Sequence, residues 1–221
     1  MKLDEKGLLI VLSGPSGVGK GTVREALFKR PDHNLVYSIS MTTRAPRDGE
    51  KNGREYFFVS REEFQKNIKE GKMLEYAEFV GNYYGTPLEE VNKQLSLGNE
   101  VVLEIEVQGA LQVRKKMHDA VFVFIAPPSI DALYNRLKRR GTESEEVIQE
   151  RIEKAKRELG LAYKYDYIVV NDTVDNAADR IMNIIRAEHA KTERTIHKYK
   201  EMLEVKDGKL WKRRNALSFY R

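Results

Sequence analysis

A glycine-rich loop near the N-terminus has the residue types and the spacing of a phosphate-binding loop. It fits the pattern G-x-x-x-x-G-K and consists of Gly14, Pro15, Ser16, Gly17, Val18, Gly19, Lys20, Gly21 and Thr22. Glycine tolerates positive φ angles, so successive main-chain N–H groups can converge on phosphate oxygens. A helix that begins after the loop would add positive charge, and Lys20 would reach the terminal phosphates. The loop therefore predicts a nucleotide site, which we assign to ATP.

The loop departs from the common pattern at one position. The serine or threonine that usually follows the lysine is replaced by Gly21, and the hydroxyl comes one residue later, on Thr22. In loops of the common pattern this hydroxyl binds Mg²⁺. We therefore expect no direct ligand for the metal from this loop, and whether another side chain contacts it is left open. Mg²⁺, the expected cofactor, would be held through the phosphates of ATP and through water.

A second candidate anion site lies in an irregular segment further along the chain. Arg44 and Arg47 are three residues apart, and paired guanidinium groups present forked donors that suit a phosphate dianion. Tyr56 and Tyr84 would add hydroxyl donors. The alternative interpretation is that the arginines form surface ion pairs. A guanine base presents N1–H and N2–H₂ as donors, so a carboxylate such as Glu75 is its natural partner.

The elements that must position these residues alternate between strands and helices. Four apolar runs are typical of strands buried on both faces, namely residues 8–12, 101–105, 121–126 and 167–170. Helix-starting residues such as Ser60, Thr86 and Ser129 lie between these runs. We expect helices over residues 20–30, 60–71, 86–98, from 129 onward, 142–156 and 175–204. The alternation predicts an α/β fold, with a mainly parallel sheet flanked by helices on both faces.

The stretch from residue 35 to residue 97 interrupts the alternation. Residues 37–41, 56–59 and 73–79 have the pattern of short strands around a small helix, and aromatic residues are dense among them. We interpret this stretch as an inserted α+β subdomain. Ligands in open α/β folds bind at the carboxyl ends of the strands, where such an insert would lie.

Several motifs together resemble the guanylate kinase family. They are the loop Gly14–Lys20, the run S-x-T-T-R-x-P-R-x-G-E over residues 40–50, and G-N-Y-Y-G over residues 81–85. The runs A-P-P-S at 126–129 and R-G-T-E at 140–143 match further on, so the resemblance covers roughly residues 7–190. It implies the reaction ATP + GMP ⇌ ADP + GDP with magnesium, carried out by a core, a GMP-binding insert and a mobile helical lid.

The resemblance also implies how the chain is divided. We expect a core with the phosphate loop at 1–34, the GMP-binding insert at 35–97, and core again at 98–128. A lid at 129–160 would follow, and then core with a C-terminal helix at 161–204. A basic tail at 205–221 lies beyond the resemblance, and its role is left open.

The resemblance further assigns roles on the GMP side. It places Arg44, Arg47, Tyr56 and Tyr84 around the phosphate of GMP. It gives the selection of guanine to Ser40, Glu75 and Thr86. Glu104 and Glu106 occupy the place of an acidic pair at a strand end, where the family frequently has aspartate that reaches the base or the hydrated metal. We assign both to GMP, and a surface charge at the strand end is the alternative. Gln108 and Gly109, next in the chain, would let the main chain approach the nucleotide.

On the ATP side the resemblance makes Arg136, Arg140 and Arg151 lid arginines that close over the phosphates. Arg136 and Arg140 are four residues apart and would share a helix face. Phosphoryl transfer builds charge on the phosphate oxygens, so these arginines and Lys20 are the expected catalytic residues. Asn171, after the strand at 167–170, would lie near the adenine of ATP, with a turn residue as the alternative.

Composition excludes several classes of protein. The chain has no cysteine, so thiol nucleophiles, disulfides and thiolate metal sites are absent. No apolar run approaches the roughly 20 residues of a membrane span. Residues 189–221 hold ten Lys or Arg and four Asp or Glu, a local +6 within a net charge of +5. The basic charge is therefore concentrated at the C-terminal end. We expect a cytoplasmic protein whose partners are ATP and GMP, with no nucleic acid and no membrane, and the oligomeric state is left open.

Two other functions are weighed. One is a non-catalytic guanylate-kinase-like module that binds protein ligands, but such modules lose residues of the phosphate loop, and Gly17, Gly19 and Lys20 are present here. The other is a kinase of the same fold that acts on a phosphorylated sugar. The guanine set of Ser40, Glu75 and Thr86 disfavours it.

Overall fold

The structure is a computed structural model that describes residues 6–139, 141 and 143–199. The chain divides into two compact units, residues 1–181 and 182–221, and each is described by itself. The predicted tail at 205–221 and the lid residue Arg140 lie outside the described residues.

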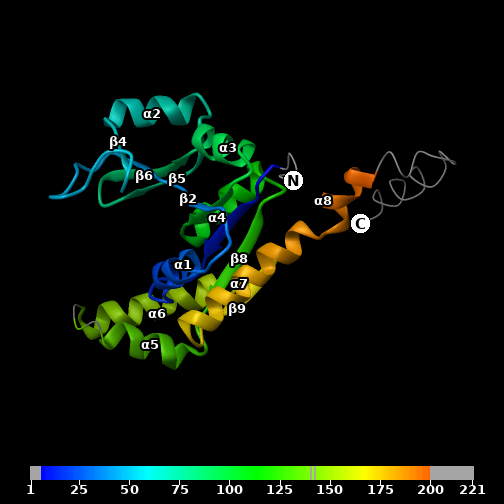
Figure 1. The fold of residues 1–221 in the computed structure, drawn as a ribbon. Helices are drawn as coiled ribbons and strands as arrows, with labels where there is room; N and C mark the ends of the chain where they lie inside the picture. Colours follow the sequence, from blue (N-terminus) through cyan, green and yellow to red (C-terminus); the bar gives the residue numbers. More distant parts are fainter. Residues whose placement is uncertain (1–5, 140, 142, 200–221) are drawn as a thin grey trace. The chain divides into compact units, whose positions relative to one another are not determined.

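A five-stranded sheet of parallel strands, the core sheet, forms the centre of the first unit (Figure 1). Its strands, in spatial order, are β2 (Leu35–Tyr37), β7 (Glu100–Glu104), β1 (Leu9–Ser13), β8 (Val121–Ala126) and β9 (Tyr167–Val170). The central strands β1 and β8 are buried throughout. The prediction of burial on both faces is wrong for residues 167–170, because β9 is an edge strand and Ile168 is 58% exposed. The predicted parallel α/β fold is confirmed.

Helices cover the core sheet. α1 (Lys20–Phe28) and α3 (Leu88–Ser96) pack against β7, and α4 (Val107–Lys116) packs against β1. Apolar residues of α3 and α4 share one core cluster with alternate residues of β1 and β7, including Leu9, Val11, Val101 and Leu103. The alternation of strand and helix along the chain thus brings the loops that follow β1 and β7 to one edge of the sheet.

A second sheet, the insert sheet, has the order β4 (Phe57–Phe58), β3 (Met41–Thr42), β6 (Asn82–Pro87) and β5 (Met73–Phe79). It carries α2 (Arg61–Lys69), whose N-terminus is capped as predicted, since Glu63 N–H donates to Ser60 Oγ at 3.1 Å. The strand predicted over residues 37–41 is wrong. Residues 35–37 pair with β7 of the core sheet, although the predicted insert begins at 35, and residues 41–42 pair within the insert sheet.

Two helices, α5 (Ile130–Arg139) and α6 (Glu145–Leu159), pack on each other through Leu133, Leu137, Ile148 and Ile152. Ser129 caps α5 as predicted, because its Oγ accepts from Ala132 N–H at 3.0 Å. α6 begins later than predicted, at Glu145, since Ser144 is its N-cap. Figure 1 shows the insert sheet on one side of α1 and this helix pair on the other.

The helix predicted over residues 175–204 is shorter. α7 (Val174–His189) ends at His189, and α8 (Thr192–Thr195) follows, with short 3₁₀ turns at Ala162–Lys164 and Ile196–Tyr199. Lys191 adopts an extended conformation with φ −58° and ψ 138°. Lys191 Nζ and the guanidinium of Arg194 both contact the buried carboxylate of Glu188. These ion pairs hold the turn that follows α7, where the sequence has no glycine or proline to end the helix.

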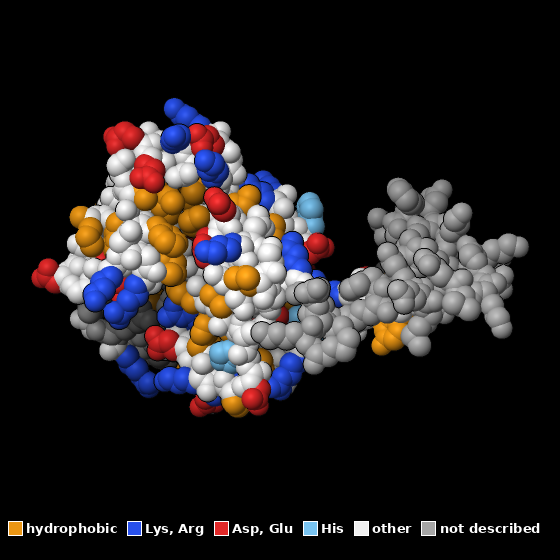
Figure 2. Space-filling model, turned by 45° about the horizontal axis from the view of Figure 1, so that its top comes forward, with side chains coloured by type: hydrophobic (Ala, Val, Ile, Leu, Met, Phe, Trp, Pro, Cys, Tyr) orange, Lys and Arg blue, Asp and Glu red, His pale blue; other side chains and the backbone are white. Residues whose placement is uncertain are grey.

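Charged side chains of both signs are interspersed over the face shown in Figure 2, with hydrophobic side chains between them. Within residues 6–199, apart from 140 and 142, no helix is long and apolar enough to cross a membrane.

Gly85 is required by the close approach of β5 and β6. A Cβ atom at this position would lie 2.5 Å from the main-chain oxygen of Glu75 and 2.9 Å from Tyr76 Cβ. Gly85→Ala is therefore expected to lower the free energy of unfolding by about 1–3 kcal/mol, the usual cost of overpacking, as measured by urea denaturation. Gly21→Ala is the matched control, because its Cβ would make only ordinary contacts, at 3.7 Å and beyond. Equal stability of the two variants would contradict the argument.

Candidate active site

The phosphate loop connects β1 to α1 and has the shape that its glycines predict. Gly17 and Gly19 have φ angles of 83° and 94°. Their missing side chains also leave room for neighbours, since a Cβ at Gly17 would lie 2.6 Å from Leu137 of α5 and one at Gly19 would lie 2.8 Å from Asn171 Nδ2. Both positions therefore combine a left-handed conformation with close packing, which only glycine satisfies.

The Lys20 ammonium group is folded onto this loop. Its Nζ donates to the main-chain oxygens of Gly14, at 2.7 Å, and Pro15, at 3.1 Å. Burial lowers the pKa of Lys20, while the carboxylates of Glu106 and Glu104 act in the opposite direction. The loop thus holds a buried cation, which suits it to the terminal phosphates of a nucleotide, and the nearby carboxylates help to keep Lys20 charged.

The main-chain carbonyl of Val18 is held by two side chains distant in sequence. Asn171 Nδ2 donates to it at 2.8 Å, and Arg136 Nη1 donates to it at 3.1 Å. Arg136 Nη2 also donates to the main-chain oxygen of Asn171 at 2.7 Å. Asn171 is 3% exposed, and its Oδ1 is buried without a hydrogen-bond partner among the described atoms. Asn171 therefore supports the loop, and its contact with adenine stays a prediction.

A second lid arginine also contacts the loop. Arg151 of α6 donates from Nη2 to Ser16 Oγ at 2.7 Å, and its Nη1 pairs with Glu143. Together with Arg136, it brings two of the predicted lid arginines to the phosphate loop from α5 and α6.

The predicted acidic pair at the end of β7 has two different partners. Glu104 Oε2 lies 3.4 Å from Arg24 Nε of α1, whereas Glu106 Oε2 lies 2.9 Å from Lys154 Nζ of α6. Neither basic residue was predicted from the sequence. Arg24 lies one helical turn after Lys20 and so shares its face of α1, which was an available signal. Lys154 carried no signal beyond the charge of its helix.

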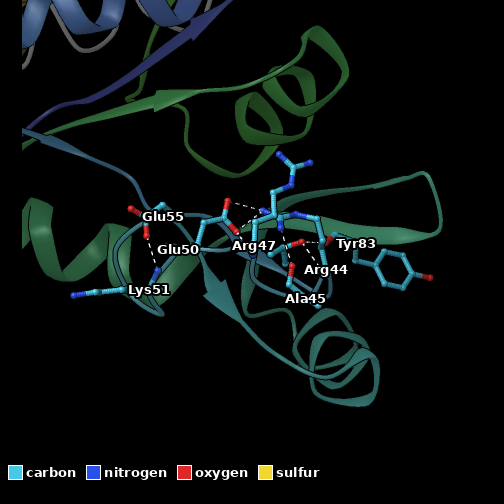
Figure 3. A network of polar contacts seen from close by, with 8 residues as sticks. Arg44, Ala45, Arg47, Glu50, Lys51, Glu55 and Tyr83 are labelled. Atoms are coloured by element: carbon cyan, nitrogen blue, oxygen red, sulfur yellow. Dashed lines mark hydrogen bonds and ion pairs between the residues drawn. The ribbon is translucent and has the colours of Figure 1, made fainter.

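The predicted arginine site is organised around a carboxylate. Both oxygens of Glu50 lie 3.0 Å from Arg44 Nη2, and Glu50 also accepts from the main-chain N–H of Arg47 at 2.8 Å (Figure 3). Glu50 is the main reason that the pKa of Arg44 lies above its ordinary value. The sequence analysis quoted Glu50 within the motif without giving it a role. Arg44 thus forms the ion pair considered as an alternative, although the side chains of this pair are only 16% and 18% exposed.

The two predicted tyrosines, Tyr56 and Tyr84, both lie beside the Arg44 guanidinium. The Arg44 guanidinium lies 5.5 Å from the centre of the Tyr56 ring, and Tyr84 is a further hydrogen-bond neighbour that raises the pKa of Arg44. The rings of Tyr56 and Tyr84 meet edge to face at 6.0 Å. Ser40 contributes its main-chain oxygen, which accepts from Phe57 N–H at 2.9 Å. The structure therefore brings Arg44, Tyr56 and Tyr84 into one cluster.

Glu75 and Thr86 form a buried pair between β5 and β6. Thr86 Oγ1 donates to Glu75 Oε1 at 2.7 Å, and Glu75 is 6% exposed. Burial raises the pKa of Glu75. The expected capping role of Thr86 is wrong, because its hydroxyl is engaged by Glu75 and Pro87 is the N-cap of α3. A Cβ at Gly109 would lie 2.9 Å from Glu75 Oε2, so the open main chain of α4 approaches this carboxylate.

Tyr37 links the phosphate loop to the insert sheet. The Arg24 guanidinium lies 4.3 Å from the centre of its ring. The pKa of Tyr37 is raised by burial and then by the charge of Glu104, and Tyr56 is a further electrostatic neighbour. Tyr37 therefore contacts the loop helix through Arg24, and Tyr56 of the cluster around Arg44 lies within electrostatic range of it.

Comparisons with known proteins agree on one family. The model of the family described as guanylate kinase matches residues 6–188. The chain is 61% identical over 202 residues to a guanylate kinase of Listeria monocytogenes, covering 91% of this chain and 98% of the relative. It is 58% identical over 208 residues to one of Streptococcus agalactiae, covering 94% of this chain and 100% of the relative. The crystal structure of guanylate kinase from Anaplasma phagocytophilum matches with a TM-score of 0.67 and 38% identity, over 87% of this chain and 91% of that chain.

The raised pKa of Glu75 makes stability depend on pH. A carboxyl group whose pKa is higher in the folded chain favours folding most below its unfolded pKa of about 4.3. That contribution is lost as the pH rises through the folded pKa. Glu75→Gln keeps an acceptor for Thr86 without a titrating proton. From about pH 4 to about pH 8, the variant should therefore gain stability relative to the wild type.

Urea denaturation of both proteins across this range measures the difference. Glu78→Gln, at an exposed carboxyl group on the same strand, controls for the substitution itself. A stability difference between the wild type and Glu75→Gln that stays constant with pH would contradict the assignment.

Proposed function

The chain belongs to the guanylate kinase family and catalyses phosphoryl transfer between ATP and GMP, and we propose that the phosphate loop and the insert sheet bind these two nucleotides. The observation that carries this proposal is the position of Tyr37, whose ring centre lies 4.3 Å from the Arg24 guanidinium of the loop helix and which has Tyr56 of the Arg44 cluster as an electrostatic neighbour. It supports a site in which the main-chain N–H groups of the loop and the guanidinium and phenol groups of the insert sheet would lie near each other. A phosphate donor and a phosphate acceptor can meet there.

On the ATP side, residues 14–22 would surround the phosphates, and Lys20 would leave the carbonyls of Gly14 and Pro15 for phosphate oxygens. Arg136 and Arg151 already contact the loop, which supports their proposed role beside the transferred phosphate. The same role is proposed for Arg140, which lies outside the described residues. Asn171 would support the loop beside the adenine.

On the GMP side, Arg44, Arg47, Tyr56 and Tyr84 would bind the phosphate dianion. Arg44 would exchange part of its contact with Glu50 for phosphate, and Glu50 would keep the guanidinium oriented. The buried carboxylate of Glu75, with Thr86, is suited to the N1–H and N2–H₂ donors of guanine. Ser40 and the acidic residues Glu104 and Glu106 complete the proposed GMP set.

Catalysis would depend on position and charge. The GMP phosphate would attack the γ-phosphorus of ATP in line, while Lys20 and the lid arginines stabilise the charge on the transferred group. No step in this scheme requires a general base. We propose residues 35–97 as the GMP-binding insert and 129–160 as a lid that excludes water when it closes. The surrounding segments 1–34, 98–128 and 161–204 would form the core.

Guanylate kinases generally need a divalent cation, and we propose Mg²⁺. The Thr22 hydroxyl donates to Gly19 O at 2.8 Å, so it is engaged within the loop. Among the described residues, no group of three or more His, Asp or Glu side chains could hold a metal ion. These facts support a cation bound mainly through nucleotide phosphates and water, where it would neutralise the charge on the phosphates. We place the reaction in the cytoplasm, with ATP and GMP as its partners.

A coupled assay of ADP formation tests the acceptor. With ATP and Mg²⁺ present, GMP should support rapid ADP formation, whereas AMP and UMP should support little, because only guanine presents both donors to Glu75. Turnover with UMP equal to that with GMP would contradict the guanine assignment. Binding of GMP without any ADP formation would favour the non-catalytic module.

Arg44 is expected to act on GMP and not on ATP. Arg44→Ala should raise the KM for GMP by about tenfold or more, since a charge-assisted contact of about 1.5–3 kcal/mol is lost. The KM for ATP should stay nearly unchanged. Arg54→Ala is the matched control, because Arg54 is an exposed arginine of the same segment that pairs with Glu55. Steady-state kinetics with each substrate varied in turn provides the measurement, and equal effects on both substrates would exclude the assignment.

A further inference from the structure

Two of the predicted lid arginines reach the phosphate loop, and they are held there in different ways. Arg136 donates to two main-chain oxygens, one in the loop and one directly after β9. Arg151 instead lies between two polar side chains. Its Nη2 donates to Ser16 Oγ of the loop at 2.7 Å, and its Nη1 pairs with Oε1 of Glu143. Arg151 is thus the one of these two arginines that is paired with a carboxylate within the described part of the chain.

Glu143 reaches Arg151 from outside the helix that carries the arginine. It comes directly before Ser144, the N-cap of α6, whose Oγ accepts from Val147 N–H at 3.5 Å. Arg151 follows two turns further along α6, next to Ile152, which packs against α5. The main-chain positions of the carboxylate and of the guanidinium are therefore set by the cap and by helix packing, and not by the ion pair itself.

The geometry of the pair directs one nitrogen of Arg151 away from the carboxylate. Arginine and carboxylate groups frequently pair through two parallel hydrogen bonds. Here Nη2 donates to Ser16 instead, and Oε2 of Glu143 is buried without a hydrogen-bond partner among the described residues. Because a buried oxygen without a donor is costly, stability alone does not explain this carboxylate. Glu143 holds Nη1, and Nη2 is directed to the phosphate loop.

The acceptor of Nη2 on the loop is one that a phosphate would replace. Ser16 Oγ is a neutral hydroxyl, whereas phosphate oxygens carry negative charge and accept stronger hydrogen bonds from a guanidinium group. The side chains of Arg151 and Glu143 are each 24% exposed, so salt screens their attraction less than that of an exposed pair. Nη1 would therefore stay on the carboxylate while Nη2 changes its acceptor.

We propose that Glu143 is a positioning residue for phosphoryl transfer, which holds Arg151 through Nη1 while Nη2 exchanges Ser16 for an oxygen of the transferred phosphate. This inference rests on the proposed function, because it needs ATP on the phosphate loop. It gives a role to a residue of the R-G-T-E motif that had none assigned. A cation that is already oriented where charge develops lowers the barrier to transfer and need not tighten the binding of either substrate.

Steady-state kinetics separates this role from substrate binding. Glu143→Gln removes the charge and keeps the size of the side chain. Its kcat should fall by about 10–100-fold, because a small displacement of a catalytic group has effects of this size. The KM values for ATP and GMP should stay nearly unchanged, as expected for a contact made only in the transition state. Glu143→Asp, which keeps the charge on a shorter side chain, should retain more activity than Glu143→Gln.

Glu153→Gln is the matched control for the loss of one charge from this part of the chain. Glu153 is an exposed carboxyl group of α6 that pairs with Lys156 at 2.7 Å. The kcat of this variant should equal that of the wild type.

A double-mutant cycle links the effect to Arg151. Glu143→Gln should lower kcat in the wild type but have almost no further effect in Arg151→Ala, since the guanidinium that it orients is then absent. A residue that only stabilises the fold would lower activity in both backgrounds. If Glu143→Gln does not fold, the same cycle is measured with Glu143→Asp.

A wild-type kcat in Glu143→Gln or in Arg151→Ala would overturn the inference, as would losses from the two substitutions that add. A rise in both KM values at unchanged kcat would also overturn it, because Glu143 would then act on binding. These results would leave the proposed function intact, since that function is tested by ADP formation in the wild type. Its failure would appear as wild-type protein that forms no ADP with GMP.

Discussion

The main-chain oxygen of Val18 must be satisfied for the phosphate loop to hold its shape. A loop that turns its N–H groups inward toward phosphate leaves carbonyl groups facing the protein, and a buried carbonyl without a donor is costly. Val18 O receives donors from Asn171, at the end of β9, and from Arg136 of α5. The shape of the phosphate loop is therefore maintained by the sheet edge and by α5, and not by the loop alone.

Each acidic residue around the site is paired with a particular cation or donor. Glu50 pairs with Arg44, Glu104 with Arg24 and Glu106 with Lys154, while Glu75 is buried against the hydroxyl of Thr86. Anionic substrates would enter a site in which positive groups already have partners. Binding would then exchange one acceptor for another, and the carboxylates would keep the cations oriented before the nucleotides arrive.

Local sequence predicted those parts of the site that local structure determines. The loop, β1 and α1 follow from glycine spacing and an apolar run, and the caps at Ser60 and Ser129 follow from side chains close to their acceptors. The motif around Arg44 predicted residues that the structure brings together with Tyr56 and Tyr84. The contact between Arg136 and Val18, 118 residues apart, could not be predicted from periodicity.

The elements that were predicted wrongly also depend on contacts that local sequence does not determine. The change of sheet after Tyr37, the exposed edge of β9 and the end of α7 at His189 each depend on contacts made after the chain folds. Pairing with β7 places residues 35–37 in the core sheet, and ion pairs with Glu188 turn the chain after α7.

The ion pair between Lys154 and Glu106 joins α6 to the start of α4 at a place open to solvent, with side chains 49% and 63% exposed. Ion pairs in water contribute little and are screened by dissolved ions. This ion pair would therefore weaken as ionic strength rises. The hydrogen bond from Arg151 to Ser16 joins a more buried guanidinium to a neutral hydroxyl, so it would depend less on ionic strength. The ease with which α6 separates from the core is thus set partly by the surrounding electrolyte.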